Sequence, residues 1–302
     1  MDNLISHIHT QLAKSTQPKG HLIPPSSHFQ NQEPQTTPLQ QKQGTAWFID
    51  GGSVILFESA SLTLAFIRIT AVLFNKKKCT KIIQKETHCL ISPESDTYTI
   101  TFFPEITPNT KITKKDRDTT TILNLIRRNL ELELATQLQG ITFIDGSLEH
   151  HHPEEPSLEK SNNKTIYGLS KTASFLFSEQ GEYTSLILSP HSFIYTPFTS
   201  TTHYNIHIVK LHPQSDYLFR LDIPQTSTPK EIANLLVSFS TDSTFLGYPY
   251  PLIKADDLAR ITNEEAESQR TRITISLGKT GQQLLERLTS KKAHSILDSL
   301  KF

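Results

Sequence analysis

Two short stretches of the chain end an apolar, strand-forming run with an aspartate and then a glycine. The tetrapeptide Phe-Ile-Asp-Gly occurs at Phe48–Gly51 and again at Phe143–Gly146. A carboxylate at the carboxyl end of a central strand lies at the sheet edge where α/β proteins bind ligands. Carboxylate oxygens are also the ligands that hard divalent cations prefer. If the two strands are neighbours, Asp50 and Asp145 predict a metal site, whereas each Asp-Gly taken alone also fits an ordinary turn.

The chemistry of such a site is phosphodiester hydrolysis. Two ions held about 3.5–4 Å apart activate a water molecule and stabilise the leaving oxygen. A third acidic residue is expected from the helical segment before the second aspartate, where Glu131 and Glu133 are the candidates. Helical spacing puts Glu133 nearer the apolar face than Glu131, so the pattern does not choose between them, and both also fit solvated helix charges.

Other residues that could take part in chemistry give less specific signals. Lys171 interrupts an apolar run, so it needs either a partner anion such as a phosphate or a path for its ammonium group to solvent. The histidines at 150–152 lie among glutamates and indicate an exposed loop rather than a metal site. The segment GKTG at 278–281 lacks the upstream glycine of a phosphate-binding loop. Basic clusters at 76–78 and 111–117 fit either contacts to DNA phosphates or solvated loops.

These residues are carried by a predicted mixed α/β domain that begins near residue 45. A helix is expected from its cap at Asp118 to Gly140, and a strand over 141–145 follows at once, which indicates an α/β unit. A tight turn is expected at 50–53, because glycine accepts positive φ. The remaining pattern predicts strands over 45–50, 53–57, 62–74, 87–93, 97–104, 165–177, 183–189, 204–212 and 217–224, a loop over 105–120, and helices over 228–245 and after the Pro-rich turn at 247–251.

The first 44 residues are expected to lie outside this domain. Residues 2–14 carry apolar side chains at helical spacing, but a helix this short is not stable alone. Residues 15–44 are rich in Pro, Gln, Ser and Thr without periodicity, so they cannot bury enough apolar surface to fold. The expected organisation is an N-terminal helix and flexible linker over 1–44, followed by a folded domain over 45–302.

Composition narrows the class of protein further. Lys and Arg together number 30, as do Asp and Glu, so the net charge of zero gives no global sign of a nucleic-acid partner. The two cysteines, Cys79 and Cys89, are expected to be free thiols in a reducing compartment, which argues against a zinc–cysteine site. No apolar stretch reaches the roughly 18 residues of a membrane span, and the first residues lack a signal-peptide pattern. We therefore expect a cytoplasmic protein with no membrane contact.

The order of the motifs resembles the NurA nucleases of archaea and some bacteria. Along the chain these motifs are FIDG, the acidic helix segment LELELA, FIDGSL, YGLSKT and GYPYPLIKADDLARI, and the similarity runs from Thr45 to Ile261. The resemblance implies a ribonuclease-H-like core, which is a mixed α/β sheet with flanking helices. It also implies a manganese-dependent 5′→3′ DNA exonuclease, in which Mg²⁺ can replace Mn²⁺, with single-strand endonuclease activity. Such a protein works as a homodimer with the hexameric helicase HerA in DNA-end resection and repair of double-strand breaks by homologous recombination.

The resemblance also implies roles for individual residues. Asp50 and Asp145 match the two metal-binding aspartates of the family. Glu131 matches the helical glutamate, with Glu133 as a register alternative. The three carboxylates would hold the two ions of a phosphodiester hydrolase.

The other residues that match the family's motifs are expected to act in catalysis rather than to bind the metal ions. Lys171 matches the lysine of the G-x-x-K strand and would orient water or phosphate, and Tyr248 matches the tyrosine of GYP. The family usually has a histidine after GYPYPLIKA, where this chain has Asp256. An aspartate can ligate a metal but cannot act as an imidazole, so this departure puts the strength of the activity in doubt.

Two other functions therefore stay open at this point. One is a catalytically weakened NurA-like module that binds DNA or the helicase. The other is a ribonuclease that acts on RNA. Retention of the acidic trio of Asp50, Asp145 and a helical glutamate favours the DNA nuclease over the binding module.

Overall fold

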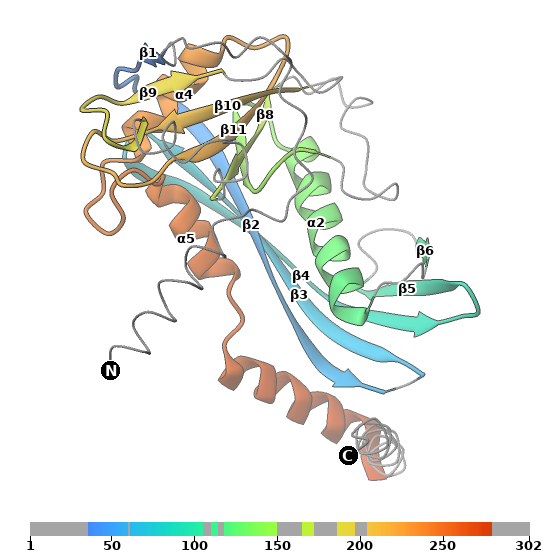
Figure 1. Cartoon of the computed structure of the whole chain (residues 1–302). Helices are drawn as coiled ribbons and strands as arrows, with labels where there is room; N and C mark the ends of the chain where they lie inside the picture. Colours follow the sequence, from blue (N-terminus) through green and yellow to red (C-terminus); the bar gives the residue numbers. More distant parts are fainter. Residues whose placement is uncertain are drawn as a thin grey trace, which may run out of the picture.

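A single mixed sheet with helices on both faces forms the body of the protein (Figure 1). The computed structural model describes residues 36–59, 61–104, 110–113, 118–149, 165–171, 186–196 and 204–279. Several predicted features lie outside the described residues, namely the N-terminal helix, the histidines at 150–152, the basic residues 114–117 and the chain after residue 279.

Eleven strands of the described residues form the sheet, in the order β1-β9-β10-β11-β8-β7-β2-β3-β4-β5-β6. Among them, β2 with β7 and β7 with β8 are parallel pairs, and the other neighbouring pairs are antiparallel. The strands are β1 (Thr36–Pro38), β2 (Thr45–Glu58), β3 (Thr63–Asn75), β4 (Lys78–Pro93), β5 (Thr97–Phe103), β6 (Thr110–Thr113), β7 (Thr142–Asp145), β8 (Ile166–Ser170), β9 (Phe193–Tyr195), β10 (Tyr204–Lys210) and β11 (Phe219–Pro224).

The long strand β2 creates an open edge in the centre of the sheet. Its parallel pairing with β7 ends at Ile49 opposite Ile144, but the strand runs on to Glu58 along β3. The tight turn expected at 50–53 is therefore wrong. These residues pair with β3 in register, which keeps the backbone extended, so the two glycines permit close packing rather than a turn. The open edge of β2 lies directly beyond the end of β7.

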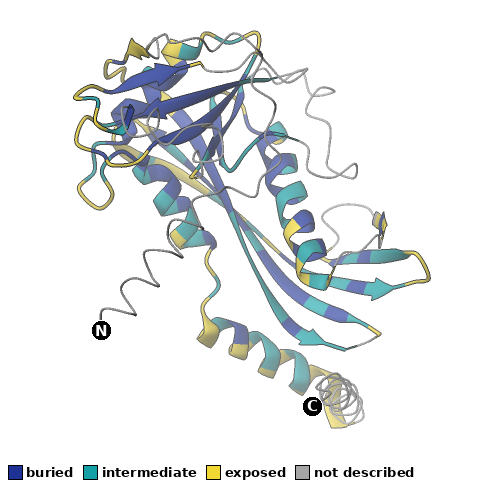
Figure 2. Ribbon diagram, viewed as in Figure 1, coloured by how far each residue is buried: buried dark blue, intermediate teal, exposed yellow. Residues whose placement is uncertain are grey.

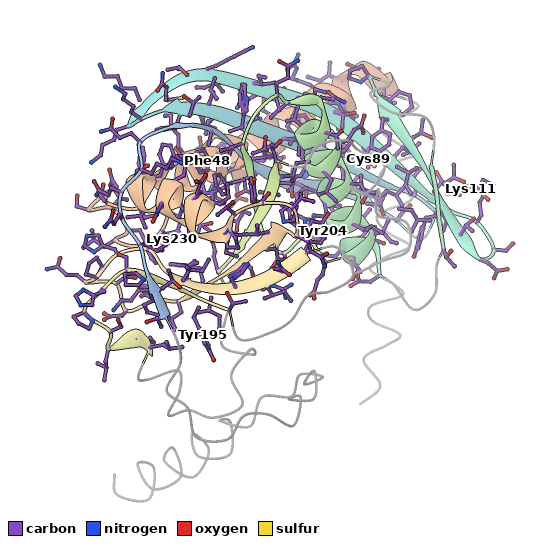
Figure 3. All side chains as sticks on the ribbon, turned by 90° about the horizontal axis from the view of Figure 1, so that it is seen from above. Phe48, Cys89, Lys111, Tyr195, Tyr204 and Lys230 are labelled. Carbon is purple, nitrogen blue, oxygen red and sulfur yellow. The ribbon has the colours of Figure 1, made fainter. Side chains whose placement is uncertain are left out.

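Helix α2 (Thr119–Gln137) covers one face of the sheet and confirms the predicted helix. As expected, Asp118 caps it, because its Oδ1 accepts a hydrogen bond from the Thr121 backbone N–H at 2.7 Å. The apolar side of the helix packs on the inner residues of β2 to β5, including Cys89, in one hydrophobic cluster. Figure 3 labels Cys89 beside this helix.

Helices α4 (Pro229–Phe239) and α5 (Tyr250–Ala259) cover the other face. Their apolar residues form a second cluster around Phe48, whose ring stacks on Phe143 at 5.3 Å and meets Phe239 edge-on at 5.1 Å. Residues 263–279 continue as a further helix. Arg68 ties this helix to the sheet, since it pairs with both Glu86 and Glu265. Figure 2 shows that burial is concentrated in the strands between these helices.

Three local expectations differ from the structure. Residues 36–38, assigned to the linker over 15–44, form the edge strand β1, because they pair with β9 and bring Leu39 to a buried position. A single edge strand of three exposed residues has no periodicity to detect. Residues 186–187, within the strand expected at 183–189, are helical, and β6 lies inside the loop expected at 105–120.

Two further findings concern the cysteines and the helices of the described residues. Cys79 and Cys89 are both free thiols. No helix in the described part of the chain combines the length and apolar character that crossing a membrane requires.

Candidate active site

The site lies at the open edge of β2, where the parallel strands β7 and β8 end. Phe48 pairs with Phe143, and Ile49 pairs with Ile144. Asp50 and Asp145 are the next residues of the two strands, so they lie side by side at the same end. Side chains alternate along a strand, so both aspartates lie on the same face as the two phenylalanines, which is the face of α5. The repeated tetrapeptide thus brings its two carboxylates together because its two copies lie in adjacent parallel strands.

Asp50 is the most buried carboxylate contributed by the sheet to this site. Its side chain is only 9% exposed, and Oδ1 accepts the backbone N–H of Gly51 at 2.7 Å. Burial, together with the negative charges of Glu131 and Asp145, raises the pKa of Asp50 to about 8, and the Gly51 hydrogen bond and the charge of Arg127 only partly oppose this rise. The three acids therefore lie close enough to repel one another.

Glu131 reaches the site from α2 on the opposite face. Its side chain is 2% exposed, and Oε1 accepts a hydrogen bond from Arg127 Nη1 at 2.6 Å. The same Arg127 nitrogen donates to the carbonyl of Gly51 at 2.9 Å and lies 3.7 Å from Asp50 Oδ1. Burial raises the pKa of Glu131, although Arg127 and Arg128 oppose that rise.

Of the two glutamates that the sequence left open, the structure places Glu131 beside Asp50, and its role as a metal ligand stays a prediction. Glu133 lies by Lys85 in a small pocket under α2, away from Asp50. A Cβ at Gly51 would lie 2.5 Å from Glu131 Oε1, so the glycine makes room for that carboxylate. Arg127 was not identified from the sequence, although its position four residues before Glu131 is the spacing of a helical ion pair.

Asp145, the last residue of β7, pairs with Lys171 just beyond the end of β8. The Lys171 ammonium donates to Asp145 Oδ2 at 2.6 Å, and its side chain is 57% exposed. Burial by itself lowers the pKa of Lys171, but the hydrogen bond and charge of Asp145, with the charges of Asp50 and Asp256, raise it above its ordinary value. The partner anion that the sequence required for Lys171 is therefore this carboxylate.

Tyr248 lies beneath Lys171, whose ammonium is 5.3 Å from the centre of the tyrosine ring. The tyrosine is 4% exposed, and burial raises its pKa, as do the charges of Asp145 and Asp50. Its hydroxyl faces the Asp145 carboxylate, whose charge and hydrogen bonding add to the rise in pKa, and no other partner stands against it in the described part of the chain. This oxygen therefore lies beside Asp145 at the candidate site.

Asp256 belongs to the rim of the same site. It lies on α5, and its charge contributes to raising the pKa of both Lys171 and Tyr248. Its Oδ2 accepts a hydrogen bond from Arg260 Nη2 at 2.6 Å, and the pair is 45% and 64% exposed. All six residues selected from the sequence therefore lie around one point, with Asp256 at the outside.

The loop after Asp145 is held by a buried ion pair that the sequence analysis missed. Asp222 on β11 accepts the Leu148 backbone N–H at 2.7 Å and two hydrogen bonds from Arg220, at 2.7 and 3.1 Å. Arg220 also pairs with Glu149 at 2.9 Å. The available signal was an arginine and an aspartate two residues apart on one face of an otherwise apolar strand.

In the described parts of the two basic clusters, 76–78 and 111–113, the lysines make other contacts. Lys77 donates to Thr241 Oγ1 at 3.1 Å, and Lys111 pairs with Glu94 at 2.9 Å. Figure 3 shows Lys111 at one extreme of the molecule. In the described part of the chain, these lysines make no contact with Asp50 or Asp145.

The donor set suits a hard divalent cation. Asp50, Glu131 and Asp145 offer carboxylate oxygens, and their mutual repulsion is the condition that a bound cation relieves. No group of three or more His, Cys, Asp or Glu side chains among the described residues stands ready-made as a metal cluster. The reason is visible in the contacts, since Arg127 engages Glu131 and Lys171 engages Asp145.

Part of the sequence matches a known family. The family model described as the NurA domain matches residues 157–261, a span that contains Lys171, Tyr248 and Asp256 but neither Asp50 nor Asp145. No curated protein matches the sequence significantly.

Solved structures extend the comparison to the whole fold. The crystal structure of the NurA nuclease from Sulfolobus solfataricus is 16% identical, with a TM-score of 0.58 over 91% of this chain and 94% of that chain. Human endonuclease V is 11% identical, with a TM-score of 0.40 over 78% of this chain and 93% of that chain. The NurA family model thus matches the part of the chain over 157–261, and the solved NurA nuclease shares the fold, a mixed α/β sheet with flanking helices as the sequence predicted.

Proposed function

We propose that this protein is a metal-dependent DNA nuclease that hydrolyses phosphodiester bonds. The observation that carries the proposal is the convergence of three carboxylates from β2, α2 and β7 at the carboxyl end of a parallel strand pair. The NurA domain and the fold shared with a NurA nuclease support it. Asp50, Glu131 and Asp145 are its proposed metal ligands, and Mn²⁺ is the proposed ion, with Mg²⁺ as a substitute.

Two divalent cations in this position would supply Lewis-acid stabilisation of the charge that develops on the scissile phosphate. The residues of the chain prepare the site for them. Arg127 partly neutralises Asp50 and Glu131, which lets acids this close remain in one buried site. Its second hydrogen bond, to the Gly51 carbonyl, fixes α2 against the open edge of β2.

Lys171 and Tyr248 are proposed to handle the phosphate. The exposed ammonium of Lys171, which is held beside Asp145, would bind a phosphate oxygen or orient the attacking water. The hydroxyl of Tyr248 keeps its proton, because burial and nearby negative charge raise its pKa, and so it can donate a hydrogen bond to the same group. Asp256 is proposed to hold the outer side of the site through Arg260.

The biological setting is proposed from the resemblance to NurA proteins. We infer a 5′→3′ exonuclease with single-strand endonuclease activity that acts as a homodimer in the cytoplasm. Its proposed partner is a HerA-type hexameric helicase, and its proposed role is DNA-end resection in double-strand break repair by homologous recombination. Mixing the purified protein with such a helicase tests this setting, because a stable complex in size-exclusion chromatography is expected.

The decisive experiment is manganese-dependent digestion of end-labelled single- and double-stranded DNA, with RNA as a parallel substrate. Asp145→Asn keeps the size of the side chain but removes its charge, so cleavage should fall by at least about 100-fold, the upper range for supporting metal interactions. Asp96→Asn, an exposed aspartate in the β4–β5 turn, is the matched control. Cleavage by Asp145→Asn at the wild-type rate would refute the assignment, and cleavage of RNA alone would make the protein a ribonuclease.

A NurA-like module that binds DNA or the helicase without cleaving is the second candidate function. The observation in its favour is that Asp256, where the family usually has histidine, is held by Arg260. It would be identified by unchanged DNA binding together with no cleavage of any nucleic acid at any manganese concentration.

A further inference from the structure

Two exposed aromatic rings form a flat surface beside the candidate active site. Tyr217 precedes β11 and Phe245 lies between α4 and α5, and their rings stack at 5.1 Å with an angle of 29° between their planes. The two residues are 52% and 39% exposed. We call Tyr217 and Phe245 the aromatic platform.

The platform is held in place from below. Phe245 meets the buried ring of Tyr248 edge-on at 6.0 Å, and that ring packs on Phe219 at 5.3 Å. The Tyr217 backbone N–H donates to Ser215 Oγ at 3.1 Å, which fixes the loop before β11. The rings are thus preorganised while their outer faces remain open to solvent.

The platform is continuous with the catalytic carboxylates. The ammonium of Lys171 lies 5.3 Å from the centre of the Tyr248 ring and donates to Asp145. Strand β11 pairs antiparallel with β8, with Arg220 opposite Ser170, so the residues before β11 lie at the carboxyl end of β8. Tyr217 therefore lies at the same sheet edge as Lys171.

We propose that nucleobases of a single-stranded nucleic acid stack on the aromatic platform while the adjoining phosphate reaches Lys171. This inference rests on the proposed function and names a substrate subsite of the same site. Stacked aromatic rings bind bases in single strands without sequence preference, because every base presents a π-face.

Binding to a fluorescein-labelled oligothymidylate, measured by anisotropy in EDTA, tests the platform without any cleavage. Phe245→Ala and Tyr217→Ala should each raise the Kd by about 5- to 150-fold, the range for loss of one aromatic stacking contact. Phe245→Trp and Tyr217→Phe keep a stacking ring and should bind like the wild type. The matched control is Phe103→Ala, because Phe103 is also 52% exposed but lies on β5. Its Kd should not change, and equal melting temperatures exclude unfolding.

A second arm uses the DNA itself. Replacing single nucleotides by abasic sites should weaken binding of the wild type at one or two positions, and Phe245→Ala should be insensitive at those positions. Because the assay contains no free metal, it reports on the platform whether or not the protein cleaves DNA. Failure of the platform alone would appear as normal cleavage with unchanged Kd in both alanine variants. Failure of the proposed function alone would appear as no cleavage with the expected losses of binding.

A contact between two copies of the chain is the competing use of exposed aromatic rings. Sedimentation velocity on the same variants measures it. If both alanine variants lose dimer and their Kd returns to the wild-type value at concentrations that restore the dimer, the base-stacking proposal is overturned. An unchanged dimer fraction with a raised Kd supports it.

Discussion

Replacing Asp222 with alanine removes the centre of the buried ion pair behind the site. Asp222 has a side chain that is 1% exposed, and Arg220, its partner, is 3% exposed. The carboxylate accepts two hydrogen bonds from Arg220 and one from the Leu148 backbone N–H. Burial raises the pKa of Asp222, and the guanidinium group of Arg220 opposes the rise, as expected of an acid that depends on its partner.

The cost of the substitution follows from what it leaves behind. Removing one partner of a buried ion pair destabilises a protein by about 3–5 kcal/mol, because the other charge stays buried. Arg220 keeps a contact with Glu149, which is 29% exposed, and this places the expected loss near the lower end. The Leu148 N–H also loses its acceptor, at a cost of about 1–3 kcal/mol. We expect the free energy of unfolding to fall by about 4 kcal/mol in all.

Urea unfolding measures this value, and Glu267→Ala is its control. The pair of Glu267 with Arg270 is 69% and 34% exposed, so its loss should cost less than about 1 kcal/mol. Asp222→Asn, which keeps the volume and one acceptor oxygen, should lie between the two variants. Because Leu148 follows Asp145 by only three residues, Asp222→Asn should also lower manganese-dependent cleavage per folded molecule.

Two results would refute this reasoning. If Asp222→Ala is no less stable than Glu267→Ala, the buried pair contributes little net stability. If Asp222→Asn cleaves DNA like the wild type at a temperature where it is fully folded, the β11 ion pair does not position the loop after Asp145.

Two further predictions concern other parts of the sheet and α2. Glu131→Gln should abolish manganese-dependent cleavage of labelled DNA, whereas Glu133→Gln should not. The reverse result would make Glu133 the metal ligand. Burial lowers the pKa of His207 to about 4, and the unfolded chain therefore takes up a proton before the folded protein does. Stability should be complete above about pH 6.5 and fall by about 3 kcal/mol as the pH drops towards 4, and urea unfolding of His207→Gln should lack that loss.

Much of the candidate site was determined by the sequence because its signals are local. An apolar run ending in aspartate forms a strand with its carboxylate at the end, and two copies meet once their strands are parallel neighbours. The helix after Asp118 is likewise set by its cap and its apolar spacing. The strand ends and the helix cap involve residues near one another in the chain, so the sequence pattern contains them, whereas the pairing of β2 with β7 joins distant segments.

Only the tertiary structure decided the features that depend on distant partners. Gly51 was expected in a turn, but pairing with β3 keeps it extended and the missing Cβ leaves room for Glu131. A helical pattern distinguishes apolar from polar faces, but it does not show that Glu131 is buried by a contact with the open edge of β2. The stacking of Tyr217 on Phe245 joins loops that lie far apart in the sequence. Such contacts exist only after the sheet has brought its strands into register, and no local propensity encodes them.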